Sequence, residues 1–327
     1  MMRVFESSFS EEEIELLNSV IKNGELGFGP NVSKFEGDFA RFSKKQYSIA
    51  TNSASASAFA IFHYLKKTYG ACDVYTPSLG FASPAWAAKH HGHNIIWVDV
   101  DDNLLFDLND YRKKRQKFCE RYTNAEITPV IMPILYGGVS TIEGFDSIRS
   151  DGYREIIVVD SAHCVTPTID SDFTFFSFHP YKPICSSDGG MISVDCSEAS
   201  DWFANYRNFG RSDYMGTYDI TQEGFKFYMN NLNASIALLS LSKYDGLLDI
   251  RKSNYGKLSN VLPQDEFSSF YFATRLSDDA NNFNSEYKLA RHYPLLHHSK
   301  YFRDGSTLPN TEKLHNKIIN LPLWKLL

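Results

Sequence analysis

The residue of this sequence whose type and position best suit chemistry on a carbonyl group is Lys182. It lies between a predicted strand and the glycine pair Gly189 and Gly190. A single loop lysine is usually a solvated surface charge. Two upstream residues favour a functional interpretation, because Asp160 ends an apolar run and His163 follows it by three residues. Together they indicate an amine that works beside a carboxylate and an imidazole.

Pyridoxal 5'-phosphate (PLP) requires an amine, a carboxylate, phosphate donors and a flat group from its protein. Lys182 could form the Schiff base. Asp160 ends a predicted strand, where open α/β sheets bind ligands, and could form a charge-assisted hydrogen bond to the pyridine nitrogen. Taken alone, Asp160 could equally be a helix cap or a turn residue. Phe81 could stack on the ring, although an aromatic residue in such a stretch is more often part of the core.

The phosphate donors are predicted in the small-residue turn formed by Ser53, Ala54 and Ser55. This turn precedes a predicted helix, whose free N–H groups and positive dipole end can hold a phosphate. Ser177, five residues before Lys182, could be another donor. A helix that starts with small residues is also common in ordinary packing. The turn is therefore a phosphate site only in combination with the other residues.

The elements that must position these residues alternate between strands and helices. Strands are predicted over residues 47–51, 72–76, 94–100, 128–135, 155–160, 173–178 and 190–194. Helices are predicted after residue 52 and over residues 83–89, 142–149, 199–208 and 231–255, and Phe35, Phe39 and Phe42 recur at helical spacing. Apolar strands that alternate with helices predict an α/β fold with a mostly parallel sheet covered on both faces.

The length of 327 residues predicts two lobes. We place their boundary inside the predicted helix 231–255, with a large domain over residues 1–245 and a small C-terminal domain over 246–327. Beyond residue 260 the pattern is weak and loop-rich.

Charge and hydropathy exclude several classes of protein. The net charge of −6 argues against nonspecific nucleic-acid binding, and the basic run 112–117 is typical of a solvated helix face. The sequence has neither a signal peptide nor a stretch apolar enough for a membrane span, which predicts a cytoplasmic protein with no membrane partner. Its five cysteines are scattered without a Cys-x-x-Cys pair, so no metal site is predicted.

In their order along the chain, these motifs resemble the sugar aminotransferases of the DegT/DnrJ/EryC1/StrS family. The resemblance extends from about Gly24 to Tyr255. Its most specific part is Asp-x-x-His at 160–163, then Ser-Phe-x-x-x-Lys at 177–182, then the glycine pair. It implies the type I aminotransferase fold, with a large, mostly parallel sheet domain and a smaller, shortened C-terminal α+β lobe. It also implies a homodimer whose active sites are completed by the neighbouring subunit.

The resemblance assigns a role to each candidate residue. Lys182 is the Schiff-base lysine, Asp160 contacts the pyridine nitrogen and His163 contacts the phenolic oxygen. Phe81 stacks on the ring. The phosphate is bound by Ser177 and by the turn Ser53-Ala54-Ser55, which stands where the family usually has Gly-Thr, and Lys226 reaches the phosphate from the other subunit.

The implied reaction is transfer of an amino group from glutamate to a nucleotide-linked 3-keto or 4-keto deoxysugar, in polysaccharide or glycan precursor biosynthesis. One alternative is a degenerate relative that binds a sugar nucleotide without turnover. Related dehydratases have histidine in place of the lysine, and Lys182 argues against that reaction. A nicotinamide-dependent enzyme is disfavoured because no Gly-x-Gly-x-x-Gly follows the first strand.

Overall fold

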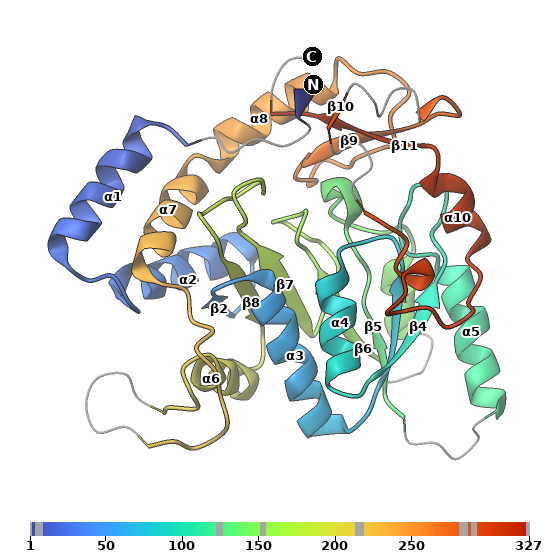
Figure 1. Ribbon diagram of the computed structural model, residues 1–327, viewed down its shortest axis with the longest axis horizontal. Coiled ribbons are helices and arrows are strands. Elements are labelled where there is room, and N and C mark those ends of the chain that lie inside the picture. The colour runs from blue at the N-terminus through green and yellow to red at the C-terminus, as the bar shows by residue number, and fades with distance from the viewer. Residues whose placement is uncertain are drawn as a thin grey trace.

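A seven-stranded sheet forms the centre of the molecule (Figure 1). The computed structural model describes residues 2–3, 9–121, 127–150, 155–212, 219–280, 287–288 and 293–324. The strand order is β2-β8-β7-β6-β5-β3-β4. The strands are β2 (Tyr47–Thr51), β3 (Asp73–Pro77), β4 (Asn94–Val98), β5 (Pro129–Ile131), β6 (Ile156–Asp160), β7 (Phe173–Ser177) and β8 (Gly190–Val194). Of these seven, only β8 runs antiparallel to its neighbours, so the predicted mostly parallel sheet is confirmed.

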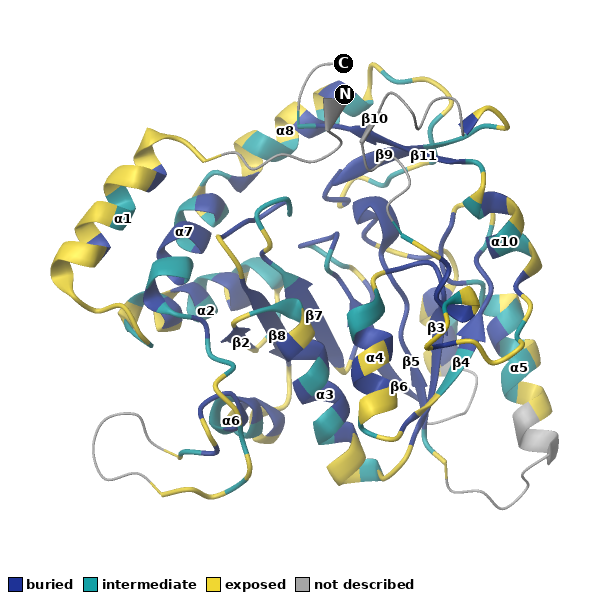
Figure 2. Cartoon of the chain, viewed as in Figure 1, coloured by how far each residue is buried: buried dark blue, intermediate teal, exposed yellow. Residues whose placement is uncertain are grey.

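The central strands are apolar on both faces because helices cover the sheet from both sides. All five residues of β6 are buried. Val158 packs on one face, against the core under α3, and Ile157 and Val159 pack on the other. This is the arrangement that continuous apolar runs predict for parallel sheets. Figure 2 shows the buried strands inside and the exposed outer sides of the helices.

Three helices cover each face of the sheet. One face is covered by α3 (Ala54–Tyr69), α4 (Ala82–His90) and α6 (Ser197–Tyr206). The opposite face is covered by α2 (Pro30–Ser43), α5 (Leu108–Arg121) and α7 (Asn231–Ser242), and α1 (Glu11–Asn23) packs on α7. The basic run 112–117 lies on α5, as predicted. No described helix is both long and apolar enough to cross a bilayer.

Two predicted helices differ in the structure. The helix predicted over 231–255 is divided at Lys243 into α7 and α8 (Tyr244–Tyr255). The bend lets α7 pack on α2 while the end of α8 packs on a separate C-terminal core. The helix predicted over 142–149 is instead the 3₁₀ helix η2 (Phe145–Ser150), in which Phe145 and Ile148 are buried at a spacing of three residues. That spacing fits three residues per turn.

The described C-terminal elements are short. The strands β9 (Phe272–Leu276) and β11 (Ile318–Pro322) form an antiparallel pair, and β1 (Met2–Arg3) pairs with β10 (Tyr287–Lys288). The 3₁₀ helix η3 (Leu296–His298) and α10 (Pro309–His315) lie between β10 and β11 in the sequence. In Figure 1, β9 and β11 lie above the large sheet, next to η1 (Tyr136–Gly138). This placement brings residues from beyond residue 260 to the edge where the central strands end.

Candidate active site

A cavity of about 490 Å³ lies at the carboxyl ends of β6 and β7, beside the first turns of α3 and α4. It brings together eight of the nine predicted site residues, namely Ser53, Ala54, Ser55, Phe81, Asp160, His163, Ser177 and Lys182. Lys226 is the one that does not line it. The carboxyl ends of neighbouring strands meet at one sheet edge, which explains how residues far apart in sequence share one space.

Asp160 is buried at the end of β6. Burial raises the pKa of its carboxyl to about 6. Two smaller effects act to lower this pKa, namely the hydrogen bond that Ala162 N–H donates to Oδ1 at 3.0 Å and the positive charge of Lys182. A cationic group placed in the cavity would favour the ionised carboxylate over the acid. Asp160 is therefore suited to hold a protonated ring nitrogen.

Lys182 has a lowered pKa, of about 8. Its main cause is burial of the amine, which the negative charge of Asp160 partly offsets. The Nζ atom lies 4.7 Å from the centre of the Tyr271 ring, so an aromatic face covers the amine. A larger neutral fraction of the amine near pH 7 makes it a better nucleophile towards carbonyl carbon than an ordinary lysine.

His163 is held by aromatic residues from the C-terminal part of the chain. Its Nε2 atom is hydrogen-bonded to the Tyr293 hydroxyl at 2.7 Å, and the two rings are stacked with centroids 5.8 Å apart. Burial raises the pKa of Tyr293 well above its usual value, so the hydroxyl stays protonated. The ring of Tyr271 lies 4.7 Å from that of His163. The imidazole therefore has a fixed orientation at the cavity wall.

The turn before α3 leaves backbone N–H groups for a ligand. Ser53 is the N-cap, and its Oγ accepts a hydrogen bond from Ala56 N at 3.2 Å. Ser57 N donates to Ser53 O, so the N–H groups of Ala54 and Ser55 precede the first intrahelical bond. Ala54 and Ser55 line the same cavity as Lys182. The geometry matches an anion site at a helix N-terminus.

Gly190 allows the turn to approach the sheet. A Cβ atom at this position would overlap the Ser53 carbonyl group and the Ala54 nitrogen. Gly190 also pairs with Ser177 across β8 and β7, which places the Ser177 side chain at the same end of the cavity. The absence of a side chain at Gly190 is thus what lets β7 and the turn share one site.

The two remaining predicted residues lie at the outside of the site. Phe81 precedes α4, lines the cavity and is 63% exposed, so it does not belong to the core. Lys226 is exposed, and its carbonyl accepts a hydrogen bond from Asn52 Nδ2 at 3.2 Å. Its backbone therefore lies next to the turn before α3, while Lys226 is not among the residues that line the cavity.

Several cavity residues have no role in the sequence-based interpretation. Tyr271 and Tyr293 contact Lys182 and His163, respectively, yet lie about 90 and 130 residues from them in sequence. Neither shows a periodicity or spacing in the sequence that would indicate a role at the site, although Tyr293 belongs to the segment 291–294, which resembles part of the family's C-terminal end. The other lining residues without a predicted role are Gly80, Ser83, Pro84, Ile134, Ala162, Phe175, His179, Tyr181 and Asp188.

Known proteins resemble this chain in sequence and in fold. The chain is 27% identical over 275 residues to the spore coat polysaccharide biosynthesis protein SpsC of Bacillus subtilis, covering 78% of this chain and 67% of SpsC. Its fold matches Helicobacter pylori PseC, an aminotransferase involved in the biosynthesis of pseudoaminic acid, with a TM-score of 0.84, 16% identity and coverage of 98% and 93%. It also matches the sugar aminotransferase CalS13 from Micromonospora echinospora, with a TM-score of 0.83, 19% identity and coverage of 100% and 96%.

The sequence as a whole matches a family model. The model of the DegT/DnrJ/EryC1/StrS aminotransferase family covers residues 7–327. The match extends well beyond Tyr255, where the resemblance in the motifs fades. The chain belongs to the DegT/DnrJ/EryC1/StrS aminotransferase family.

Proposed function

We propose that this chain is a cytoplasmic PLP-dependent aminotransferase that converts a nucleotide-linked keto sugar to the amino sugar nucleotide, with glutamate as donor, in polysaccharide or glycan precursor biosynthesis. One observation carries the proposal: a lysine of lowered pKa, a buried carboxylate and a helix N-terminus surround a single cavity. Membership of an aminotransferase family and the resemblance to SpsC support it.

The donor set fits PLP. The N–H groups of Ala54 and Ser55 would hold the phosphate, Asp160 the ring nitrogen, and Phe81 one face of the ring. Bound PLP supplies an electron sink for the bond that breaks at the amino-acid α-carbon. The cavity volume of about 490 Å³ lies within the range of small-molecule sites.

The part that Lys182 plays depends on its loss and gain of a proton. In its neutral form, Nζ would hold the bound cofactor covalently at its carbonyl carbon, and it would be set free once the donor's amino group takes its place. From the cavity wall, the freed Nζ would take the proton from the α-carbon of the donor and return it to the former carbonyl carbon of the cofactor. His163, whose ring is fixed by Tyr293, would orient polar groups of the ligand.

The lowered pKa of Lys182 predicts how the rate of PLP attachment depends on pH. Because the neutral amine is the nucleophile, attachment to the apoprotein should quicken about tenfold per pH unit below a midpoint near 8, and level off above it. Asp160→Asn should move this midpoint to lower pH, since the Asp160 charge raises the lysine pKa. Stopped-flow absorbance from pH 6 to 10 measures both. A midpoint near 10.5, as in an unperturbed lysine, would contradict the assignment.

A substrate panel tests the reaction itself. The protein loaded with pyridoxamine phosphate is mixed with 3-keto and 4-keto sugar nucleotides, and the visible absorption of lysine-bound PLP is followed. The proposal expects this absorption to return with at least one sugar, together with an amino sugar detectable by mass spectrometry. Sugar binding without any return of absorption would support the non-catalytic alternative instead.

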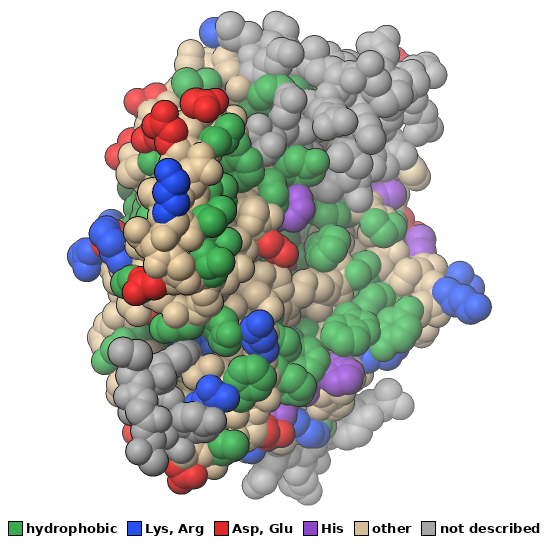
Figure 3. Space-filling model, turned by 60° about the vertical axis from the view of Figure 1, so that its left-hand side comes forward, with side chains coloured by type: hydrophobic (Ala, Val, Ile, Leu, Met, Phe, Trp, Pro, Cys, Tyr) green, Lys and Arg blue, Asp and Glu red, His purple; other side chains and the backbone are tan. Residues whose placement is uncertain are grey.

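We also infer that the protein assembles as a homodimer, in which a second copy of this chain covers the surface beside the cavity. Phe81, which directly precedes α4, and Trp86 on α4 are both exposed. The ring of Trp86 contacts that of Phe59, which in turn contacts Phe225, and the centroids are 6.1 Å apart in each contact. Lys226 follows directly. Figure 3 shows hydrophobic side chains gathered on one face, with histidines among them. An aromatic surface of this kind beside a cavity favours a protein interface.

Subunit mixing tests whether Lys226 serves the neighbouring site. Lys226→Ala should weaken PLP binding about tenfold or more, because a charge-assisted phosphate contact is lost. Lys182→Ala chains cannot attach PLP but keep Lys226. Mixed dimers of the two variants should regain one tight site, measured by PLP titration after joint refolding. If Lys226 acted within its own chain, mixing would restore nothing.

A further inference from the structure

We propose that His297, His298 and Glu312 form a site for a divalent transition-metal ion such as Zn²⁺, separate from the cavity. Their ligand atoms all lie within 4.8 Å of one another. Nε2 of His297 and Nε2 of His298 lie 3.1 Å and 3.6 Å from Oε1 of Glu312. Ligands at about 2.1 Å from a tetrahedral Zn²⁺ are about 3.4 Å apart. These side chains therefore need little movement to share one ion.

His297 is already oriented as a ligand. Its side chain is fully buried, and Nδ1 lies 2.7 Å from the Oγ atom of Ser78, which is buried too. Histidine ligands usually have their second ring nitrogen held by such a bond, which fixes the direction of the ring, and donation from Nδ1–H to Ser78 Oγ would leave the Nε2 lone pair for an ion. With Nδ1 engaged, Nε2 is the nitrogen that faces Glu312.

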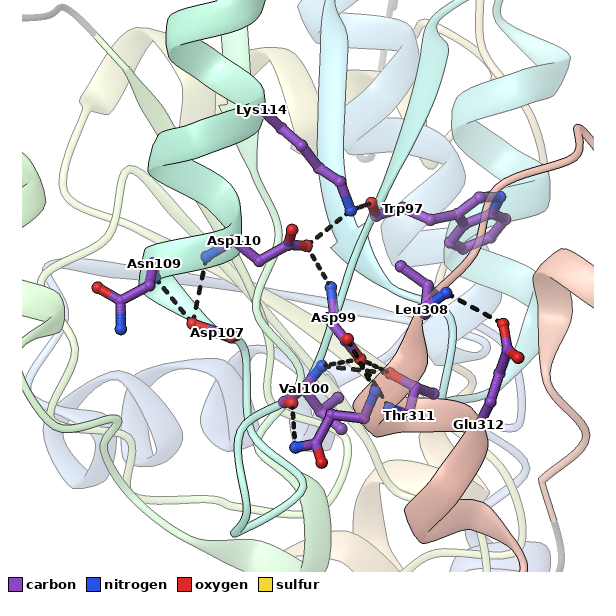
Figure 4. A network of polar contacts seen from close by, with 11 residues as sticks. Trp97, Asp99, Val100, Asp107, Asn109, Asp110, Lys114, Leu308, Thr311 and Glu312 are labelled. Atoms are coloured by element: carbon purple, nitrogen blue, oxygen red, sulfur yellow. Dashed lines mark hydrogen bonds and ion pairs between the residues drawn. The ribbon is translucent and has the colours of Figure 1, made fainter.

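Glu312 is placed by the attachment of α10 to the end of β4 (Figure 4). Asp99 accepts hydrogen bonds from Thr311 N and Thr311 Oγ1 at 2.7 and 2.6 Å, and from Asn310 N at 3.0 Å. The Glu312 carboxylate itself accepts a bond from Leu308 N at 3.0 Å. The carboxylate is thus held beside the histidines before any ion binds.

The outer side of the cluster is open to solvent. The side chains of His298 and Glu312 are 56% and 36% exposed, which gives an ion a path of entry and leaves water as the fourth ligand. Two imidazoles and one carboxylate favour Zn²⁺, Co²⁺, Ni²⁺ or Cu²⁺ over Mg²⁺ and Ca²⁺, which prefer oxygen ligands.

An ion here would join three segments of the chain. It would connect η3 to α10 directly, and through His297 to Ser78 in the segment that leads to Phe81. The same segments already touch, because Leu296 N donates to Ser78 O at 3.0 Å. The ion's role is therefore structural, because it would stabilise the C-terminal segment against the loop before α4. This inference does not depend on the proposed reaction.

Calorimetric titration of chelator-treated, untagged protein with ZnCl₂ tests the site. We expect one Zn²⁺ per chain, a thermal midpoint that rises with Zn²⁺ concentration, and the visible absorption of tetrahedral Co²⁺ when CoCl₂ replaces zinc. His298→Ala and Glu312→Gln should each weaken binding at least about 100-fold, and Ser78→Ala about tenfold. The metal-free thermal midpoint verifies that each variant is folded.

Two matched controls separate this site from incidental zinc binding. His90→Ala removes an exposed histidine elsewhere, and Cys196→Ser removes an exposed thiol. Both should bind Zn²⁺ like the wild type. The proposal is overturned if wild-type affinity equals that of His298→Ala, if either control variant loses the binding, or if bound Co²⁺ has an octahedral spectrum.

Discussion

Lys182→Ala is expected to abolish covalent attachment of PLP and to slow transamination by at least about 10⁴-fold. Among the described residues that line the cavity, Lys182 alone has a primary amine. Under the proposed function, its removal would eliminate both the attachment point and the group that moves the α-proton. Borohydride reduction followed by peptide mass spectrometry measures the attachment, and coupled assays measure the turnover.

Lys34→Ala provides a matched control for this variant. Lys34 lies on α2 with 63% of its side chain exposed and pairs with Asp38. Exposed pairs of this kind contribute about 0–1 kcal/mol to stability, so this variant should keep both the label and the activity. A label that persists in Lys182→Ala, or one that is lost in Lys34→Ala, would show that the attachment site is misassigned.

Asp160→Asn is expected to leave PLP attached but to lower kcat about 10²- to 10³-fold. An asparagine can still accept the Ala162 N–H bond, so the local backbone should keep its conformation. It has no negative charge with which to keep the ring nitrogen protonated, so electron withdrawal weakens. Cofactor content from absorbance and the separate values of kcat and KM distinguish lost chemistry from lost binding.

Asp188→Asn tests whether any carboxylate of the cavity would have the same effect. Asp188 also lines the cavity but is exposed, and its Oδ1 accepts a bond from Gly189 N. We expect a change of less than about tenfold in kcat, because water already screens this charge. Equal losses in the two variants would remove the special role of Asp160.

The sequence predicted the strands of the large sheet better than the connections between them. The bounds of β2 and β8 agree with the prediction, and β6 and β7 differ by one residue at one end. Their buried runs are long enough to identify, and each ends at a polar residue or directly before one. The bend at Lys243 could not be predicted, because Lys243 itself is neither proline nor glycine and two separate cores determine the bend. The domain boundary at residue 245 remains a prediction.

Some of the cavity residues could be identified from the sequence, and others could not. Asp160 and Ser177 could be found because parallel strands place their carboxyl ends at one edge. Tyr271 and Tyr293 could not, because they reach Lys182 and His163 only through the return of the C-terminal segment. The roles of the individual residues towards PLP remain predictions.

By itself the sequence determined the family and the order of the candidate cofactor residues, because chemistry requires particular side chains and strands place them at one edge. Only the tertiary structure decided the pKa values of Lys182 and Asp160, since burial by distant segments sets the cost of their charges. It also decided that Lys226 is not among the residues that line the cavity, and that His297 meets Glu312. Contacts between residues far apart in the chain have no local pattern from which they could be predicted.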